Sequence, residues 1–201
     1  MGTLFPIEDM PISTKNNEWF TPHIYIEAAR SVMGGIDLDV ASCEIANKTV
    51  KAARYYTKEQ DGLKQPWQGR IWLNPPFGKV DNKSYIRLFI LKLLEEYQLG
   101  NVKQAVLLTT VRTDCSWFAP LWNCPICFCD HHVNFYQTGD TPGRPGRTTA
   151  SHIHGTIFVY LGPNINLFVE HFTDFGPVVT PDGVHKRPQP LQQPTLWDQE
   201  A

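Results

Sequence analysis

The chain has 201 residues, of which 42% are hydrophobic, and a formal net charge of −2 at pH 7. This length and composition suffice for one buried core, so we expect one domain and no second globular unit. There is no apolar run of about 18 residues and no signal-peptide pattern, so we expect a soluble intracellular protein and no membrane span. Five cysteines, an odd number, favour reduced thiols over a disulfide framework.

Charge is unevenly distributed along the chain. Residues 1–61 contain six Lys and Arg against nine Asp and Glu, whereas residues 70–120 contain seven against four. The chain as a whole has no basic signature, but a locally positive middle suits a polyanionic partner.

In chain order, the first half of the sequence predicts helices alternating with strands. Residues 1–18 are polar and predict a flexible arm. Apolar spacing predicts a helix over residues 22–33, with Thr21 as its N-cap and Pro22 at its first position. Short strands are expected at 36–40 and 70–73, joined by a mostly irregular segment, 41–69. An apolar face predicts a helix at 83–99, and residues 102–109 predict a strand buried on both faces.

The second half predicts shorter elements: a helical turn at 117–122, paired strands at 126–129 and 132–136, and a strand at 153–161. The Pro- and Gln-rich residues 176–201 predict a mobile tail, so the expected domain spans residues 19–175. Strand, helix and strand in this order imply a doubly wound α/β sheet with helices on both faces. Ligands bind at the carboxyl ends of such strands, which places Asp37, Asp39 and residues 74–77 on one edge.

The most informative segment is Asn74-Pro75-Pro76-Phe77, directly after an apolar run. The amine of adenine shares its lone pair with the ring, so it attacks a methyl group poorly unless acceptors hold its two hydrogens. The Asn74 side-chain oxygen and the Pro75 carbonyl can be those acceptors, since the prolines fix φ and offer no competing N–H. Phe77 offers a flat face for a base removed from its stack. The alternative is a Pro-Pro turn that ends a strand.

Several motifs occur in the order found in the phage-type DNA N6-adenine methyltransferase (Dam-like) family, which the chain resembles over about residues 18–160. They are Trp19-Phe20-Thr21-Pro22, residues 36–42, Tyr55-Tyr56, Asp61-Gly62-Leu63, Trp67, residues 72–78, Leu107-Leu108, Arg112-Thr113-Asp114 with Trp117-Phe118, and Val133-Asn134-Phe135-Tyr136. The resemblance implies a Rossmann-like methyltransferase sheet, S-adenosylmethionine as methyl donor and adenine in double-stranded DNA as acceptor. It also implies the cytoplasm of a bacterium or a phage-infected cell.

The roles of the family's motif residues can be transferred to the matching positions of this sequence. They imply catalytic and cofactor-binding residues but no metal ligands. The catalytic segment would be Asn74, Pro75, Pro76 and Phe77, with Asn74 and Pro75 on the target N6 and Phe77 against the flipped base. The cofactor-binding residues would be Trp19, Thr21, Pro22, Asp37, Asp39, Asp61 and Asn74. Asp61 would accept from the cofactor's adenine, and Asp39 would contact its ribose or amino group.

Simpler alternatives stand beside the cofactor assignments. Asp61 with Gly62 suits an Asp-Gly turn. One of Asp37 and Asp39 can merely cap the turn after the first strand, and the segment around Pro22 can anchor the first helix. The sequence also departs from the family at Val40, where relatives often have proline, and it has no Gly-rich turn after the first strand.

The candidate DNA contacts are all basic: Lys79, Lys83, Arg112, Arg144 and Arg147. Arg112 could equally form a salt bridge with Asp114. The loop 138–151 has almost no apolar residues and cannot pack, which favours a DNA-binding or sequence-reading loop over a solvated connector.

Two further clusters contain residue types that can bind a metal or a partner protein. Cys124, Cys127 and Cys129 are possible zinc ligands, but the spacing lacks a second pair and buried free thiols explain it, so no metal is predicted. Gln193, Leu196 and Trp197 are similar to peptides that dock onto bacterial sliding clamps, although a frayed tail is the simpler alternative.

The sequence thus favours a DNA adenine methyltransferase. Two alternatives remain open: an amino-methyltransferase acting on protein glutamine or RNA, and a catalytically inactive DNA-binding or clamp-associated relative.

Overall fold

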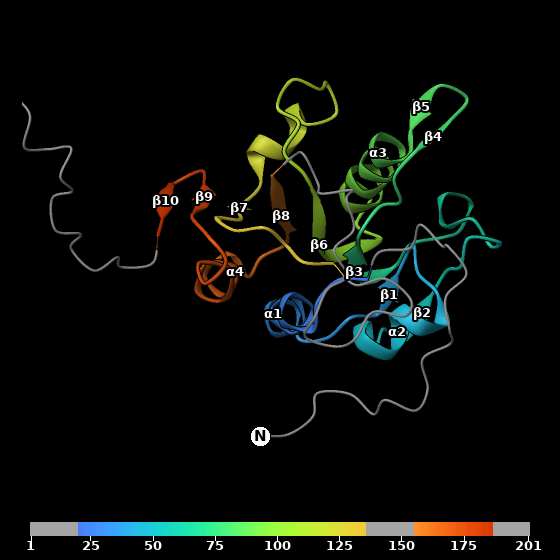
Figure 1. The fold of residues 1–201 in the computed structure, drawn as a ribbon, viewed down its shortest axis with the longest axis horizontal. Helices are drawn as coiled ribbons and strands as arrows, with labels where there is room; N and C mark the ends of the chain where they lie inside the picture. The colour runs from blue at the N-terminus through green and yellow to red at the C-terminus, as the bar shows by residue number, and fades with distance from the viewer. Residues whose placement is uncertain (1–19, 136–154, 187–201) are drawn as a thin grey trace, which may run out of the picture.

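The computed structural model describes residues 20–135 and 155–186, and all structural statements concern these residues. Eight strands form one sheet in the order β10-β9-β7-β8-β6-β3-β1-β2, and β4 and β5 form a separate hairpin (Figure 1). The strands are β1 (Leu38–Asp39), β2 (Arg54–Tyr55), β3 (Gly69–Leu73), β4 (Lys79–Val80), β5 (Lys83–Ser84), β6 (Val102–Thr110), β7 (Ile126–Phe128), β8 (Thr156–Leu161), β9 (Val178–Thr180) and β10 (Gly183–His185). The helices are α1 (His23–Met33), α2 (Glu44–Val50), α3 (Tyr85–Gln98) and α4 (Ile165–Phe172), with 3-10 turns η2 (Gly62–Lys64) and η3 (Ala119–Asn123).

The sheet has a parallel half and an antiparallel half. Strands β2, β1, β3 and β6 pair in parallel. Strands β8, β7, β9 and β10 continue the sheet in antiparallel pairs. The predicted α/β architecture is confirmed, but as a mixed sheet. The prediction that 126–129 pairs with 132–136 is wrong for the described residues, because β7 pairs with β8 and β9 and residues 132–135 form no strand.

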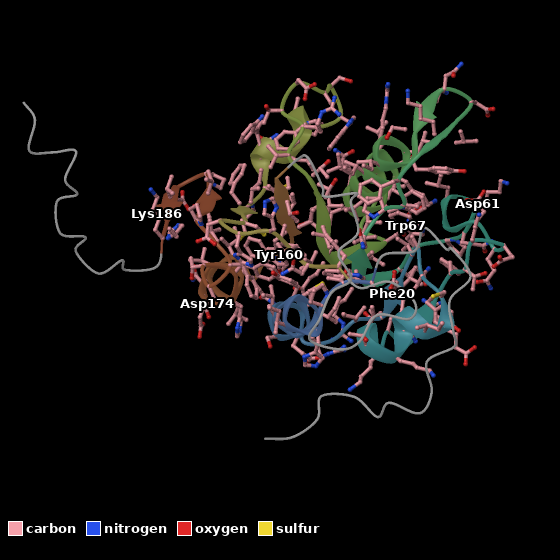
Figure 2. All side chains as sticks on the ribbon, viewed as in Figure 1. Phe20, Asp61, Trp67, Tyr160, Asp174 and Lys186 are labelled. Atoms are coloured by element: carbon pink, nitrogen blue, oxygen red, sulfur yellow. The ribbon has the colours of Figure 1, made fainter. Side chains whose placement is uncertain are left out.

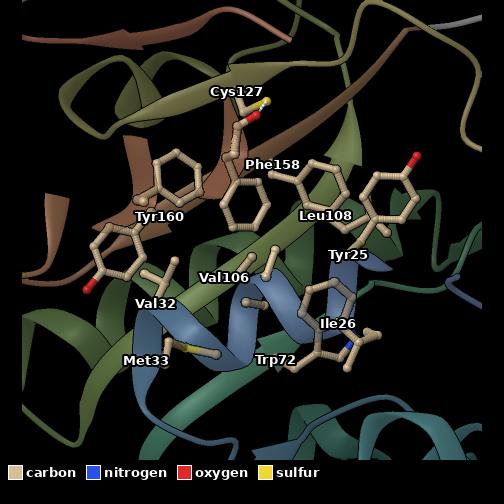
Figure 3. Close-up of a cluster of buried hydrophobic side chains, with 14 of the residues drawn as sticks. Tyr25, Ile26, Val32, Met33, Trp72, Val106, Leu108, Cys127, Phe158 and Tyr160 are labelled. Atoms are coloured by element: carbon tan, nitrogen blue, oxygen red, sulfur yellow. Dashed lines mark hydrogen bonds between the residues drawn. The ribbon is translucent and has the colours of Figure 1, made fainter. Parts of the chain in front are cut away.

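Helices cover both faces of the sheet, as the sequence predicts. Alternate residues of the central strands point to opposite sides, so Trp72 and Val106 belong to one core cluster and Ile71 and Leu107 to the other. Figure 1 shows α1, α2 and α4 on one face and α3 on the other. Figure 3 shows the first cluster, in which side chains of α1 pack against the sheet around Phe158.

The two helices predicted with clear apolar faces are present. Helix α1 buries Ile26, Ala29 and Val32 at helical spacing and ends at Gly34, whose φ of 74° is left-handed. It begins one residue later than expected, with Pro22 at the N-cap position, so the prediction of Thr21 as N-cap is wrong. Helix α3 likewise buries one face, within the limits 83–99 predicted for it.

Other elements depart from the sequence-based expectation. The segment 41–69 is mostly irregular, as predicted, but it also contains α2, β2 and η2, which the sequence did not predict. The tail predicted from residue 176 instead supplies β9 and β10, which extend the sheet to residue 185. The remainder of that tail, the arm 1–18 and the loop 138–151 lie outside the described residues.

Candidate active site

A hollow lined by both polar and apolar side chains lies at the carboxyl ends of β1 and β3, between the start of α1 and α2. Its empty volume is about 330 Å³, including the part that opens to solvent. The register pairs Asp39 of β1 with Trp72 of β3, so Asn74 follows only two residues beyond the strand position level with Asp39. The lining residues are Phe20, Thr21, Asp39, Ala41, Ala46, Thr49, Val50, Trp72 and Asn74. The fold therefore brings together three predicted site residues from three separate segments: Thr21, Asp39 and Asn74.

The side chain of Asn74 is held by the residue that precedes α1. Its Nδ2 donates to the Thr21 hydroxyl at 3.3 Å. With the amide nitrogen turned to Thr21, its Oδ1 accepts no hydrogen bond from the described residues and is the acceptor left for a ligand. Pro75 is buried, whereas Pro76 and Phe77 are exposed, Phe77 by 47%. The segment thus contributes Asn74 to the lining of the hollow and an aromatic ring to the surface.

Asp39 is a buried carboxyl group, with only 3% of its surface exposed. Burial raises its pKa from 3.8 to about 6, because a low-dielectric environment disfavours the charged form. The Ala41 N–H, which donates to Oδ1 at 3.3 Å, offsets part of this rise. The Ser42 hydroxyl also lowers the pKa but lies outside hydrogen-bond geometry. A ligand that donates to Asp39 would stabilise its ionised form.

The other carboxylate of the first strand region, Asp37, has a structural partner. Its Oδ1 lies 2.6 Å from Arg70 Nη2, and its Oδ2 accepts from the Nε and backbone N–H of Arg70. Hydrogen bonding to Arg70 lowers the Asp37 pKa. Arg70 also donates to the Gly34 carbonyl, so the pair joins the end of α1 to the start of β3. Asp37 does not line the hollow.

Asp61 forms the turn that its Asp-Gly sequence allows. Its φ is 55°, its Oδ1 accepts from the Leu63 N–H at 3.2 Å, and its Oδ2 lies 3.0 Å from Lys64 Nζ. Figure 2 shows Asp61 near the outer edge of the molecule, apart from Phe20, which lines the hollow. Gly62 packs against the carbonyl of Val40, so the turn still borders the end of β1.

The candidate DNA contacts have different surroundings. Lys79 and Lys83 are exposed on the β4–β5 hairpin directly after the Asn-Pro-Pro-Phe segment. Arg112 instead pairs with Asp114, with Nε 2.9 Å from Oδ1, and this hydrogen bond raises the Arg112 pKa. The predicted residues outside the described part are Trp19, Arg144, Arg147, Gln193, Leu196 and Trp197.

Sequence reasoning missed the contribution of α2 to the hollow. Ala46, Thr49 and Val50 line it from a helix that buries only one residue, Val50, and so has no clear apolar period. The sequence predicts Trp72 only as part of an apolar strand, whereas in the structure it borders both the core and the hollow. The sequence does give a signal for one further lining residue, Phe20, because it belongs to the motif Trp19-Phe20-Thr21-Pro22 that carries the family resemblance.

The cysteine cluster is part of the core rather than the hollow. Cys127 is buried on β7, and its thiol donates to the Phe172 carbonyl at 3.3 Å (Figure 3). Within residues 20–135 and 155–186, no group of three or more His, Cys, Asp or Glu side chains is placed to hold a metal ion.

The mixed α/β sheet has a hollow at the carboxyl ends of its parallel strands, which is where α/β proteins commonly bind ligands. A family model described as DNA N-6-adenine-methyltransferase (Dam) matches residues 10–150. The chain belongs to this family, and membership implies DNA adenine methyltransferase activity in general, with DNA as substrate. No curated protein and no solved structure matches the chain. None of the helices in its described part is long and apolar enough to cross a membrane.

Proposed function

We propose that this protein is a site-specific DNA methyltransferase that moves a methyl group from S-adenosylmethionine to the N6 of an adenine flipped out of duplex DNA. The observation that carries the proposal is the shared hollow of Asn74 and the buried carboxyl of Asp39 at the ends of neighbouring parallel strands. Parallel strands with helices on both faces support a Rossmann-like methyltransferase fold.

The residues of the hollow fit S-adenosylmethionine, which supplies a methyl group activated by its sulfonium. Asp39 is a buried acceptor with only a weak intramolecular donor, which suits a ribose hydroxyl or an amino group. Phe20 and Trp72 add aromatic surface next to it. We assign Thr21, Asp39 and Asn74 to this cofactor, with Pro22 and Trp19 in the adjoining segment. Asp37 and Asp61 are engaged elsewhere in the described structure.

Catalysis in this proposal is mainly hydrogen bonding and orientation. Asn74 Oδ1 and the Pro75 carbonyl accept the two N6 hydrogens, which localises the lone pair of the amine and makes it a better nucleophile. The Thr21 hydroxyl fixes the Asn74 amide so that its oxygen faces the substrate. Binding holds the reacting atoms in line, so the loss of translational and rotational entropy occurs on binding and does not add to the barrier of the chemical step. The proton released from N6 leaves through Asn74 Oδ1 to water.

A duplex hides adenine, so the protein must hold a flipped base at its surface. Phe77, whose ring is exposed, follows the two acceptor residues in the sequence and would stack on that base. Lys79 and Lys83, on the hairpin that follows, would contact phosphates. Unstacking and unpairing cost a few kcal/mol, which these contacts offset.

Methyl transfer from labelled cofactor to DNA tests the proposal. We expect Asn74→Ala to reduce the rate by about 100-fold or more, the usual effect of losing one key catalytic hydrogen bond. Thr21→Val should reduce it by about tenfold, because the acceptor remains but its support is lost. Lys103→Ala, at the opposite end of β6, is the matched control and should leave the rate unchanged.

Each other result would have a definite meaning. Equal labelling of adenine by the wild type and Asn74→Ala would refute the catalytic assignment. Labelling of protein or RNA with none in DNA would select an amino-methyltransferase of another substrate class. Absence of cofactor binding in calorimetry would select an inactive DNA-binding relative.

A further inference from the structure

The β4–β5 hairpin presents polar side chains that the protein itself does not use. Its four exposed residues are Lys79, Asp81, Asn82 and Lys83. None of these side chains forms a hydrogen bond or ion pair with the part of the chain that the structure describes. The hairpin is rooted beside the proposed catalytic segment, because the Tyr85 N–H donates to the Gly78 carbonyl at 3.1 Å and Gly78 directly follows Phe77.

The turn at the tip retains two side chains where glycine would be easier. Val80 pairs with Lys83, which leaves the two-residue turn Asp81-Asn82. Their φ values are 49° and 60°, as in a type I′ turn, which most favours Asn-Gly. Asp and Asn are the residues other than glycine that most readily adopt such φ values, so the turn presents two hydrogen-bonding side chains at its tip.

The register of the hairpin sends its two lysines to opposite faces. Residues directly opposite in an antiparallel pair share a face, and neighbours along a strand alternate. Lys79 is opposite Ser84, and Lys83 is opposite Val80, so Lys79 and Lys83 project from different faces. Two cations on the two faces of a narrow ribbon match the two phosphate backbones that border a DNA groove.

The dimensions of the hairpin suit the major groove. From Gly78 to the tip the chain spans three residues, or about 10 Å in extended conformation. The major groove is about 8.5 Å deep and about 12 Å wide and admits a two-stranded ribbon. The tip would therefore reach base edges within about three base pairs of the flipped adenine, since bases stack at about 3.4 Å along a strand.

We propose that the β4–β5 hairpin enters the major groove of duplex DNA beside the target adenine, with Asp81 and Asn82 reading base edges and Lys79 and Lys83 holding the two backbones. This inference rests on the proposed function and adds the element that reads sequence. The chemistry at the tip suits two bases: an Asn amide pairs with adenine, and a carboxylate accepts from the cytosine amino group.

The test uses substitutions that keep the turn and remove its chemistry. In the double variant Asp81→Gly/Asn82→Gly the tip becomes Gly-Gly, a pair that a type I′ turn favours, so the hairpin is retained without either side chain. Sequencing of modified adenines after expression in a methylation-free host should then show relaxed preference within about three base pairs of the target. Discrimination there should fall by about tenfold to hundredfold, the range for losing one good base contact. Asp81→Asn alone, which keeps Asn82, is the matched control and should relax fewer positions.

Duplex binding measured by fluorescence anisotropy tests the lysines independently of catalysis. Lys79→Ala and Lys83→Ala should each weaken binding equally on all sequences and reduce the slope of log affinity against log salt by about 0.9. The control Lys103→Ala should change neither the affinity nor the slope.

An active double variant with an unchanged modification pattern would overturn the base-reading role. Unchanged salt slopes would overturn the groove placement. A wild type that binds DNA with these hairpin effects but transfers no methyl group would refute only the proposed function.

Discussion

Asp39 shows how one buried residue couples the site to pH. Its pKa is raised in the folded protein, from 3.8 to about 6, by burial. Between these two pH values the folded protein holds a proton that the unfolded chain releases, so stability falls as the pH rises through this window. The destabilisation is absent below about pH 4 and complete above about pH 6. A shift of about two units corresponds to about 3 kcal/mol.

We therefore expect Asp39→Asn, which keeps the shape without the charge, to stabilise the fold at pH 8 by up to about 3 kcal/mol and to have little effect at pH 4. The same variant should bind S-adenosylmethionine more weakly at pH 8, since a ligand that donates to Asp39 needs its ionised form. Wild-type affinity should itself decline as the pH falls through about 6. Urea unfolding and calorimetry at both pH values measure the two effects. A stability difference that does not change with pH would contradict this account of burial.

From residue identities alone, Asn74, Asp39 and Thr21 can be proposed as site residues, but the hollow that they share and their contacts cannot be predicted. The sequence predicts Thr21 as the N-cap of α1, whereas its contact with Asn74 depends on packing between residues far apart in the sequence. Asp37 and Asp39 look equivalent in the sequence, because each is a polar residue between two apolar ones in the alternating segment 36–40. Only the fold brings Arg70 to Asp37 and so separates a structural carboxylate from the one that lines the hollow.

At the scale of elements, the turn η2 supports the end of β1 because residue 62 is glycine. A Cβ there would overlap the Val40 carbonyl, which immediately follows Asp39, and would also lie 3.6 Å from the Phe89 ring. The backbone of β1 cannot move away easily, since the side chains of Leu38 and Val40 are fully buried. The close approach of η2 to β1 therefore requires the absence of a side chain.

Gly62→Ala should consequently destabilise the protein by about 1–3 kcal/mol, the usual cost of overpacking, and should weaken cofactor binding at Asp39. Gly155→Ala is the matched control, because a Cβ at residue 155 meets only the Val111 side chain at an ordinary distance of 3.5 Å. Thermal unfolding of the two variants measures the difference. Equal midpoints for Gly62→Ala and the wild type would show that η2 is not held against β1.

Elements with a wide apolar face could be predicted, and elements held by the rest of the fold could not. Helices α1 and α3 each bury several side chains along one face, which the sequence displays. Helix α2 buries a single side chain, and its N-cap Cys43 accepts from the Ala46 N–H through sulfur, an unusual cap. Strands β9 and β10 could not be predicted either, because a strand of three residues is too short to show an alternation of polar and apolar residues.

For the whole molecule, the sheet divides into a parallel half that carries the hollow and an antiparallel half that completes the core. Strand β9 pairs with β7, where Val179 lies opposite Ile126 and Val178 opposite Cys127. Val178 is fully buried in the cluster that also contains Phe172. Removal of β9 would thus expose the edge of β7 and one face of that core.

Two deletions distinguish this architecture from the mobile tail that composition predicts. A chain ending at residue 175 loses β9 and β10, and we expect it to be destabilised by at least about 2 kcal/mol, because burying one valine alone contributes about that much and the strand pairing is also lost. A chain ending at residue 186 keeps every described element and should unfold at the wild-type temperature and bind S-adenosylmethionine as the wild type does. Circular dichroism melts and calorimetry compare the two. If the chain ending at residue 175 melts at the wild-type temperature, residues 176–186 do not stabilise the sheet. If the chain ending at residue 186 melts at a lower temperature than the wild type, residues 187–201 have a structural role.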